Sequence, residues 1–272
     1  MTWLGYDRYC TELEAEAGRI ADAVYDADLA LRVPTCPEWT LVDLVQHVGA
    51  AHRWAADMIE RRVTAPVRPE RADPPPEPDA RSAWLLAGAR RLNEAVRAAG
   101  PQAAVWSWST DQTAGFWSRR ILHDTLVHRF DAEIAVGRAA QREDRSLRGP
   151  QSQASHTVAV APDLAADSVS DLLATFAVIA AREPDHGLRG TRETLHFHAT
   201  DEGLDSAGEW LVRRTPAGVE WEHGHAKGDV AVRGPAADLI LVLSRRVAPH
   251  ATQLEVLGDE RLFTHWLDNT VF

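Results

Sequence analysis

The sequence predicts an α + (α+β) protein, in which a four-helix bundle is followed by a smaller α+β domain. Apolar residues recur at helical spacing through the first half of the chain, and short segments of alternating polarity fill the second half. Between the halves, residues 138–162 are polar and lose this periodicity. We therefore predict a helical domain over residues 1–150 and an α+β domain over residues 151–272.

Four helices are expected in the first domain. Their predicted ranges are 6–31, 41–61, 80–99 and 113–137. Thr40 and Asp43 resemble a capping box at the start of the second helix. Residues 33–39 contain two prolines, which favour a turn or an extended segment, and the proline-rich residues 64–79 predict a surface loop. Helices joined in this way are typical of a bundle.

The second domain is expected to begin with a helix at about 163–182. The segments that follow are short, alternate in polarity and are separated by Gly, Pro and Asp, which is typical of antiparallel strands. The predicted strands are 194–200, 209–213, 219–222, 229–233 and 254–257, with a helix at 235–246 and another at the C-terminus.

Composition excludes several classes of protein. A formal charge of −11, with Lys227 as the only lysine, argues against a nucleic-acid partner. No uninterrupted apolar run approaches the ~18 residues that span a bilayer, and the N-terminal residues lack a secretory signal, so we expect a cytoplasmic protein without a membrane partner. Cys10 and Cys36 are too few for a disulfide framework and are expected to be free.

Ionisable side chains share a face with apolar ones on two predicted helices. One face of the fourth helix carries Trp117, Ile121, Asp124, His128, Asp131 and Ala135, and the apolar stripe of the second carries Thr40, Leu44, His47, Ala51, Trp54 and Met58. Two imidazoles and one carboxylate match a catalytic zinc site that keeps one position open. The alternative is a hydrogen-bonded core His47 beside a simple ion pair of Asp124 with His128. His52 and His123 are expected to face solvent or to lie directly behind the ligands.

Further histidines and aromatic residues allow two interpretations each. Trp106, Trp108 and Trp117 either line a substrate pocket or pack in the core. His196 with His198, and His223 with His225, are spaced to place both rings of a pair on one face of a strand, which is compatible with metal binding. Without a carboxylate at a convincing position, we interpret this second pattern as chance.

Three segments resemble the mycothiol-dependent maleylpyruvate isomerase family: CPEWTLVDLVQHVGAAHRWA, VWSWSTDQTAGFWSRRILHDTLVHRFDAEIAVG and DVAVRGPAADLILVLSRR, at residues 36–55, 105–137 and 229–246. The resemblance implies a DinB-like four-helix domain and a sterol-carrier-like C-terminal domain. It also implies zinc, or another divalent metal, on His47, Asp124 and His128, although the family usually has Glu in place of Asp124. Phe130 likewise replaces a commoner Trp.

The resemblance further implies mycothiol as a thiol cosubstrate, held as a metal-bound thiolate. Our main expectation is transfer of this thiol to a small electrophile in biosynthesis or detoxification. One alternative is cis–trans isomerisation of maleylpyruvate; others are a non-catalytic binding protein with a vestigial metal site and a metal-dependent hydrolase. The sequence does not indicate an oligomeric state. The predicted catalytic residues are Arg53, Arg245 and Arg246, and the predicted cofactor-binding residues are Arg233 and Trp117.

Overall fold

The computed structural model describes residues 4–148 and 159–270, with side chains at 4–141 and 159–270. The chain forms two compact units, Gly5–His156 and Met1–Leu4 with Thr157–Phe272. The predicted boundary between residues 150 and 151 lies outside the described residues and stays a prediction. The predicted fold class is confirmed, because a four-helix unit precedes a smaller unit of helices and strands.

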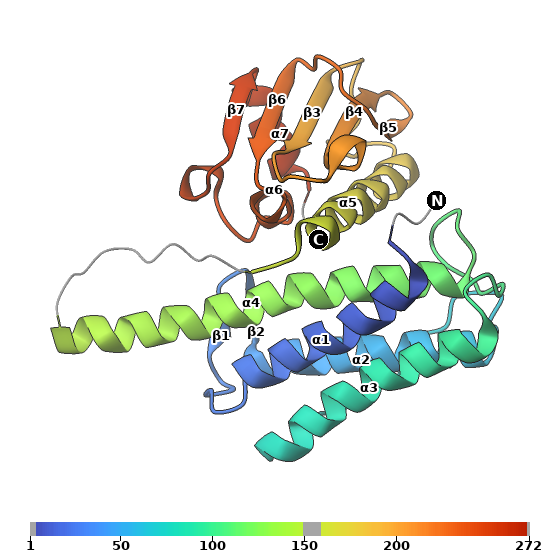
Figure 1. Ribbon diagram of the computed structural model, residues 1–272, viewed down its shortest axis with the longest axis vertical. Helices are drawn as coiled ribbons and strands as arrows, with labels where there is room; N and C mark the ends of the chain where they lie inside the picture. Colours follow the sequence, from blue (N-terminus) through green and yellow to red (C-terminus); the bar gives the residue numbers. More distant parts are fainter. Residues whose placement is uncertain (1–3, 149–158, 271–272) are drawn as a thin grey trace. The chain divides into compact units, whose positions relative to one another are not determined.

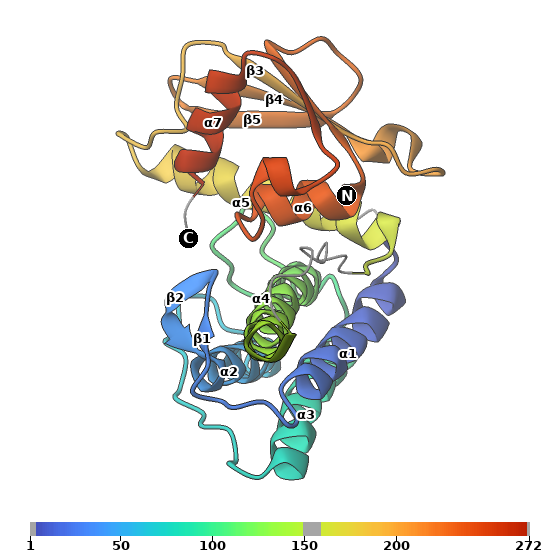
Figure 2. The same cartoon turned by 90° about the vertical axis from the view of Figure 1, so that its left-hand side faces the viewer.

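The N-terminal unit is built from four long helices. They are α1 (Tyr6–Ala23), α2 (Leu41–Glu60), α3 (Pro78–Ala99) and α4 (Ala114–Arg148). α4 packs against α1 and α2, and α3 packs against the same two helices. Figure 2 looks along α4 and shows α1 and α2 on different sides of it. The faces that meet are apolar, so this unit has the core that the helical periodicity predicted.

Two helix ends differ from the prediction. α1 ends at Ala23 rather than near residue 31. The carbonyls of Val24 and Tyr25 accept hydrogen bonds from the Arg81 guanidinium of α3 instead of continuing the helix, and Asp28 organises a further turn by accepting from the amide of Ala30. α4 continues to Arg148 rather than ending at 137. The added residues include Ala, Gln, Glu and Arg, which favour a helix even without an apolar stripe.

A short hairpin leads into α2. Its strands are β1 (Arg32–Val33) and β2 (Cys36–Thr40), which pair antiparallel and extend one residue beyond each end of the segment predicted to be extended or turned. The capping box is confirmed: the Thr40 amide donates to Asp43 Oδ2 at 2.8 Å, and the box fixes the start of α2. The hairpin thereby places Trp39 close to the second turn of α2, where His47 lies.

α2 and α3 approach closely at Gly49. A Cβ atom added there would lie 1.9 Å from Cζ3 of Trp84 on α3, so the indole occupies the space that any side chain at position 49 would need. The contact agrees with the expectation that the small residues of α2 let another helix approach closely.

Gly49→Ala is expected to destabilise the N-terminal unit by up to about 2 kcal/mol. Overpacking costs about 1–3 kcal/mol, whereas the better helix propensity of alanine returns about 1 kcal/mol. The free energy of unfolding from urea titration checks this. The matched control is Gly18→Ala in α1, where the nearest atom to the new Cβ is Leu86 Cδ2 at 3.9 Å. Equal stability of the two variants would contradict the proposed clash.

The C-terminal unit is a five-stranded sheet with helices. Its elements are α5 (Pro162–Arg182), β3 (Thr194–Ala199), β4 (Glu209–Thr215), β5 (Gly218–His223), β6 (Val230–Gly234), α6 (Ala236–Leu243), β7 (Glu255–Gly258) and α7 (Glu260–Asp268), with short 3-10 helices at Asp205–Gly208 and Pro249–Ala251. The strands lie in the order β5-β4-β3-β6-β7 (Figure 1). Each predicted strand is present.

The sheet is mixed rather than purely antiparallel. β3 pairs parallel with β6, and the other neighbours are antiparallel. β5 and β6 therefore point the same way, so residues 224–229 must carry the chain back along the sheet between them. The alternating polarity of the sequence predicted strands correctly but did not reveal this return segment.

One face of the sheet packs on α5 and α7. Phe197 of β3 contacts Trp266 of α7, with ring centroids 6.1 Å apart, and the Trp210 indole of β4 donates to Ser170 Oγ of α5 at 2.8 Å. α5 is long and apolar enough to span a membrane by length and composition, but 72% of its most apolar window is buried inside the structure. Its apolar residues thus belong to the core of this unit.

Candidate metal centre

The three predicted metal ligands lie together in the N-terminal unit. His47 comes from α2, and Asp124 and His128 stand one turn apart on α4. One ligand atom from each residue lies within 4.8 Å of the other two. The His47 Nε2 atom is 3.4 Å from Asp124 Oδ2, and His128 Nε2 is 3.9 Å from the same oxygen.

These separations suit ligands of one small cation. Two nitrogen or oxygen atoms bound to zinc at tetrahedral angles, each about 2.0–2.1 Å from the ion, stand about 3.3 Å apart. The two nitrogen-to-oxygen distances of the cluster, 3.4 and 3.9 Å, are close to that value. Two imidazoles and one carboxylate therefore fit a divalent cation with a fourth position left for another ligand.

Asp131 orients the imidazole of His128. His128 Nδ1 donates to Asp131 Oδ2 at 2.8 Å, which leaves Nε2 as the nitrogen with a free lone pair facing the cluster. Asp131 is fully buried and also accepts a hydrogen bond from Thr35 Oγ1, while Cys36 Sγ lies 3.8 Å from its second oxygen. A carboxylate behind a histidine is the usual support of a metal ligand.

Asp124 is held as a carboxylate. Burial acts to raise its pKa, but the hydrogen bond to His47 and the electrostatic interactions with His128 and Arg120 outweigh burial, so its pKa lies well below the ordinary value. The Arg120 guanidinium donates to Oδ1 at 3.2 Å. This contact uses the oxygen that does not face the two histidines, and Oδ2 remains directed toward them.

An open groove of about 470 Å³ adjoins the cluster at His47. Its other lining residues are Glu38, Trp39, Asp43, Gln46, Ala50, Pro69, Glu70, Arg71 and Ala72. The Trp39 ring packs on both histidines, with centroids 4.8 Å from His47 and 5.5 Å from His128. His47 is itself partly exposed, so a small molecule in the groove reaches the three candidate ligands from the side of the cluster that His47 and Trp39 border.

His52 and His123 are buried in the bundle, so of the two expected positions the solvent-facing one is wrong and the one behind the ligands stays a prediction. His52 Nε2 lies 2.9 Å from Thr125 Oγ1, and that hydroxyl donates to the carbonyl of Ile121, so the imidazole is the donor to Thr125. Burial lowers the pKa of His52 to about 4, with the nearby Arg53 charge acting in the same direction and Asp124 opposing it. This ring is neutral in the folded protein at neutral pH.

The neutral His52 makes stability depend on pH. As the pH falls below 6.5, the ordinary pKa of histidine, His52 binds a proton in the unfolded chain. In the folded protein His52 does not bind this proton until the pH reaches about 4. We expect the metal-free protein to lose up to about 3 kcal/mol from this residue as the pH falls from 6.5 to 4.

Urea unfolding in chelator at pH 7 and pH 5 checks this contribution. His52→Gln, whose amide can still donate to Thr125, should lose less stability between these pH values than the parent protein. His250→Gln, a change at an exposed residue, is the control and should keep the parental pH dependence. An identical pH dependence in the parent and His52→Gln would refute the assignment.

The arginine predicted on α2 does not join the cluster. Arg53 donates to the carbonyls of Gly49 at 2.9 Å and Trp84 at 2.7 Å, and its guanidinium stacks on the Trp84 ring at 4.0 Å. These contacts hold it between α2 and α3, as a helix-packing residue. Its catalytic role, predicted from its place on the metal-bearing helix, gains no support from this position.

Trp117 is buried rather than lining the groove. Its indole donates to the Trp106 carbonyl at 2.8 Å, and its ring packs on Trp54 and Phe116 with centroids 5.0 and 5.2 Å away. These contacts match the core-packing interpretation, and the cofactor-binding interpretation stays an untested prediction.

The remaining predicted arginines belong to the C-terminal unit. Arg233 on β6 is 3.9 Å from Glu255 on β7, Arg245 is exposed with a φ of 63°, and Arg246 donates to the carbonyl of Ser244 at 2.6 Å. Their roles toward a substrate stay predictions.

The residues that support the ligands were not assigned that role from the sequence. Asp131 shares the helix face of His128 at i+3, and that spacing was a usable signal. Arg120 stands four residues before Asp124 and carries the same kind of signal. Thr35 and Trp39 had no such signal, because the hairpin that contains them reaches the cluster only through tertiary packing.

Two family domains match the chain. The mycothiol maleylpyruvate isomerase N-terminal domain matches residues 10–133, which include all three candidate ligands, and the MDMPI C-terminal domain matches residues 163–265. The chain belongs to the mycothiol-dependent maleylpyruvate isomerase family. The suspected resemblance is thereby confirmed, and with it the expectation of an enzyme.

Solved structures of a mycothiol-dependent maleylpyruvate isomerase are similar to the chain at 15% sequence identity. One covers 93% of this chain and 93% of its own with a TM-score of 0.49. A mutant of that isomerase covers 88% of each chain, also with a TM-score of 0.49. No curated protein matches the sequence.

Proposed function

We propose that this member of the family is a mycothiol-dependent cis–trans isomerase of the maleylpyruvate type, with a divalent metal, zinc first, on His47, Asp124 and His128. One observation carries the proposal. The three ligand atoms lie within 4.8 Å of one another inside the segment that matches the family's N-terminal domain. The family description favours isomerisation over our main expectation of thiol transfer, which is not confirmed.

The residues of the cluster suit the binding of a thiol. A divalent cation, when bound, would hold the sulfur as a thiolate and keep it nucleophilic at neutral pH. Asp131 fixes the tautomer in which His128 offers Nε2, and Arg120 holds Asp124 in place. Trp39 packs on the rings of both histidines and holds them in place beside the groove.

The groove beside His47 is suited to the sugar part of the thiol. Its carboxylates, Glu38, Asp43 and Glu70, accept hydrogen bonds from hydroxyl groups, and Trp39 offers an aromatic face to a sugar ring. Two hydrogen bonds from Thr40 lower the pKa of Asp43 and keep it ionised. Arg71 is the one basic residue of the lining, and it pairs with Asp73 at 2.8 Å.

The reaction needs no net change in the thiol. When bound, mycothiol would supply a thiolate for reversible addition to the carbon–carbon double bond of a cis-configured conjugated diacid, with the adjacent carbonyl accepting the electron pair. Rotation about the resulting single bond and expulsion of the same thiolate would give the trans isomer. The two carboxylates of such a substrate require cationic partners. Arg245 and Arg246 are our candidates for them.

Thiol transfer to an electrophile is the second candidate, and the charge of the groove favours it. Three carboxylates against one paired arginine form a poor surface for a dianionic substrate, whereas a neutral electrophile would meet no repulsion. Both candidates use the same metal and the same thiol, so they differ only in the fate of the adduct.

Metal analysis followed by assay with two substrates tests the proposal. Protein purified without chelator should contain zinc that depends on His47, and titration with mycothiol should change the absorption of a cobalt-substituted sample. Mycothiol-dependent conversion of maleylpyruvate to its trans isomer, without consumption of thiol, would support isomerisation. Stoichiometric thiol consumption with a neutral electrophile, and no isomerisation, would favour transfer. Turnover that does not require mycothiol would overturn both candidate reactions.

A further inference from the structure

A second cluster of potential metal ligands lies in the C-terminal unit. His196 Nε2 is 3.1 Å from Glu209 Oε2, His225 Nδ1 is 2.5 Å from the same oxygen, and His198 Nε2 is 3.9 Å from Glu209 Oε1. One ligand atom each from His196, Glu209 and His225 lies within 4.8 Å of the other two. Three imidazoles therefore surround one carboxylate.

Strand register brings the first three side chains together. His196 and His198 alternate with Phe197 on β3, so they project from the sheet face opposite the one that packs on α5 and α7. Glu209 on β4 is the direct partner of His198 across the antiparallel pair. This register supplies the carboxylate whose absence from the local sequence made the histidine pattern look like chance.

The return segment supplies the fourth side chain. Residues 224–229 run back along the sheet from the end of β5 to the start of β6, and His225 lies near the beginning of this segment. Its ring centroid is 5.3 Å from that of His196 and 6.3 Å from that of His198. Side chains from β3, β4 and the return segment thus meet at one point on this face.

Hydrogen bonding accounts for only part of this arrangement. Glu209 accepts from His196 and His225, but His198 lies 3.9 Å from the carboxylate, which is beyond hydrogen-bond reach. The same 3.9 Å separates His128 Nε2 from Asp124 Oδ2 in the N-terminal cluster. His196 is also nearly buried, with 5% of its surface exposed, so its imidazole is fixed in this position.

We propose that His196, His198, Glu209 and His225 form a second binding site, for a divalent transition-metal cation of the zinc class. Imidazole and carboxylate donors suit zinc, and nickel or copper would bind the same set. The His225 ring must rotate about its exposed side chain to change its hydrogen bond to Glu209 into a shared ligand position, and the His198 ring must move closer, because its Nε2 lies 3.9 Å from Glu209 Oε1.

The second site is structural rather than catalytic. Four protein ligands complete a tetrahedral shell, so no position remains for a substrate. Its effect is to tie the return segment to the two strands that it crosses. The proposal does not depend on the thiol chemistry of the N-terminal unit.

Zinc titration of the full chain with the first site removed tests this proposal. The parent for the test is the His47→Ala, His128→Ala double variant, with far-UV circular dichroism confirming its fold. Calorimetry with zinc alone should give one ion per chain, and saturating zinc should raise the melting temperature. A folded double variant that binds no zinc would overturn the proposal.

Two further variants of that parent locate the ion. Adding His225→Ala, at an exposed position where folding is not at risk, should weaken zinc binding by more than about 100-fold, because even outer supports of a metal ligand are worth 10–100-fold. The matched control is His223→Ala, which belongs to the same sequence pair but whose ring packs on Trp210 and Trp221. Equal losses in the two variants, or none in His225→Ala, would assign the zinc elsewhere.

Discussion

His128→Ala should lose the metal of the N-terminal unit and at least about 10³-fold of its thiol-dependent turnover. The loss follows because His47 and Asp124 alone cannot complete the ligand set, and a metal contributes several kcal/mol to the stabilisation of developing charge. Elemental analysis should show one zinc fewer per chain than the parent. Steady-state assays with saturating mycothiol measure the turnover.

Asp131→Asn is the informative companion to this variant. It leaves all three proposed ligands in place but replaces the acceptor of His128 Nδ1 by a weaker, neutral partner. We expect metal affinity to fall by about 10–100-fold, with activity restored by added zinc. Rescue of Asp131→Asn together with no rescue of His128→Ala would separate the support of the ligand from the ligand itself. Full metal content in His128→Ala would refute the ligand assignment.

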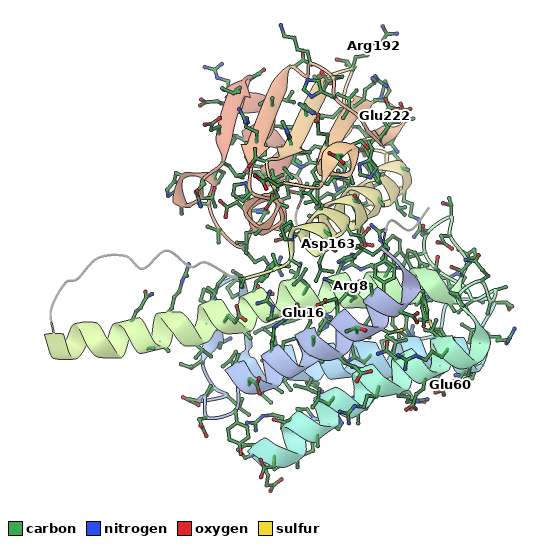
Figure 3. The ribbon with its side chains drawn as sticks, viewed as in Figure 1. Arg8, Glu16, Glu60, Asp163, Arg192 and Glu222 are labelled. Carbon is green, nitrogen blue, oxygen red and sulfur yellow. The ribbon has the colours of Figure 1, made fainter. Side chains whose placement is uncertain are left out.

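Arg129→Met should lower the free energy of unfolding by about 3 kcal/mol, the largest stability effect that we expect from the described residues. Arg129 on α4 is buried and pairs with Glu16 of α1, which is labelled in Figure 3 and is fully buried. Removing the arginine leaves a buried carboxylate with less compensation, which typically costs about 3–5 kcal/mol. The lower end applies because Arg19 still contacts Glu16.

Two controls separate burial from charge in this experiment. Arg91 pairs with Glu60, also labelled in Figure 3, but both side chains are more than 40% exposed, so Arg91→Met should cost less than about 1 kcal/mol. The double variant Glu16→Leu, Arg129→Met should recover most of the loss, because it removes both buried charges. Urea unfolding measures all of them. Similar losses for Arg129→Met and Arg91→Met would contradict the argument.

Much of the fold was predictable because the signals are local. Helical periodicity located four bundle helices, and Thr40 with Asp43 correctly marked the start of α2. The predicted end of α1 was wrong because residues after Ala23 keep apolar spacing, whereas the hydrogen bonds from Arg81 to the carbonyls of Val24 and Tyr25 form only in the folded bundle. The parallel pair of β3 and β6 was not predictable, since strand order depends on which edges meet after the hairpin of β4 and β5 forms.

The candidate sites show the same division. Periodicity placed Asp124 and His128 on one face, and the resemblance, rather than spacing, joined them to His47. The supports from the β1–β2 hairpin and the carboxylate of the second cluster were not recognised, because Thr35 and Glu209 approach their partners only in three dimensions. The packing of Arg53 on Trp84 of α3 was not predictable for a similar reason, because this neighbour could not be identified from α2 alone.

The placement of the three ligands has a consequence for protein synthesis. The chain between His47 and Asp124 includes all of α3, so a ribosome must complete most of the bundle before the third ligand exists. A nascent chain that ends before α4 offers a single imidazole, which is a weak and unselective metal ligand. The metal would therefore bind only after the bundle has closed, so that a bound metal marks a unit whose folding is complete. An unfinished chain would not compete for the cell's zinc.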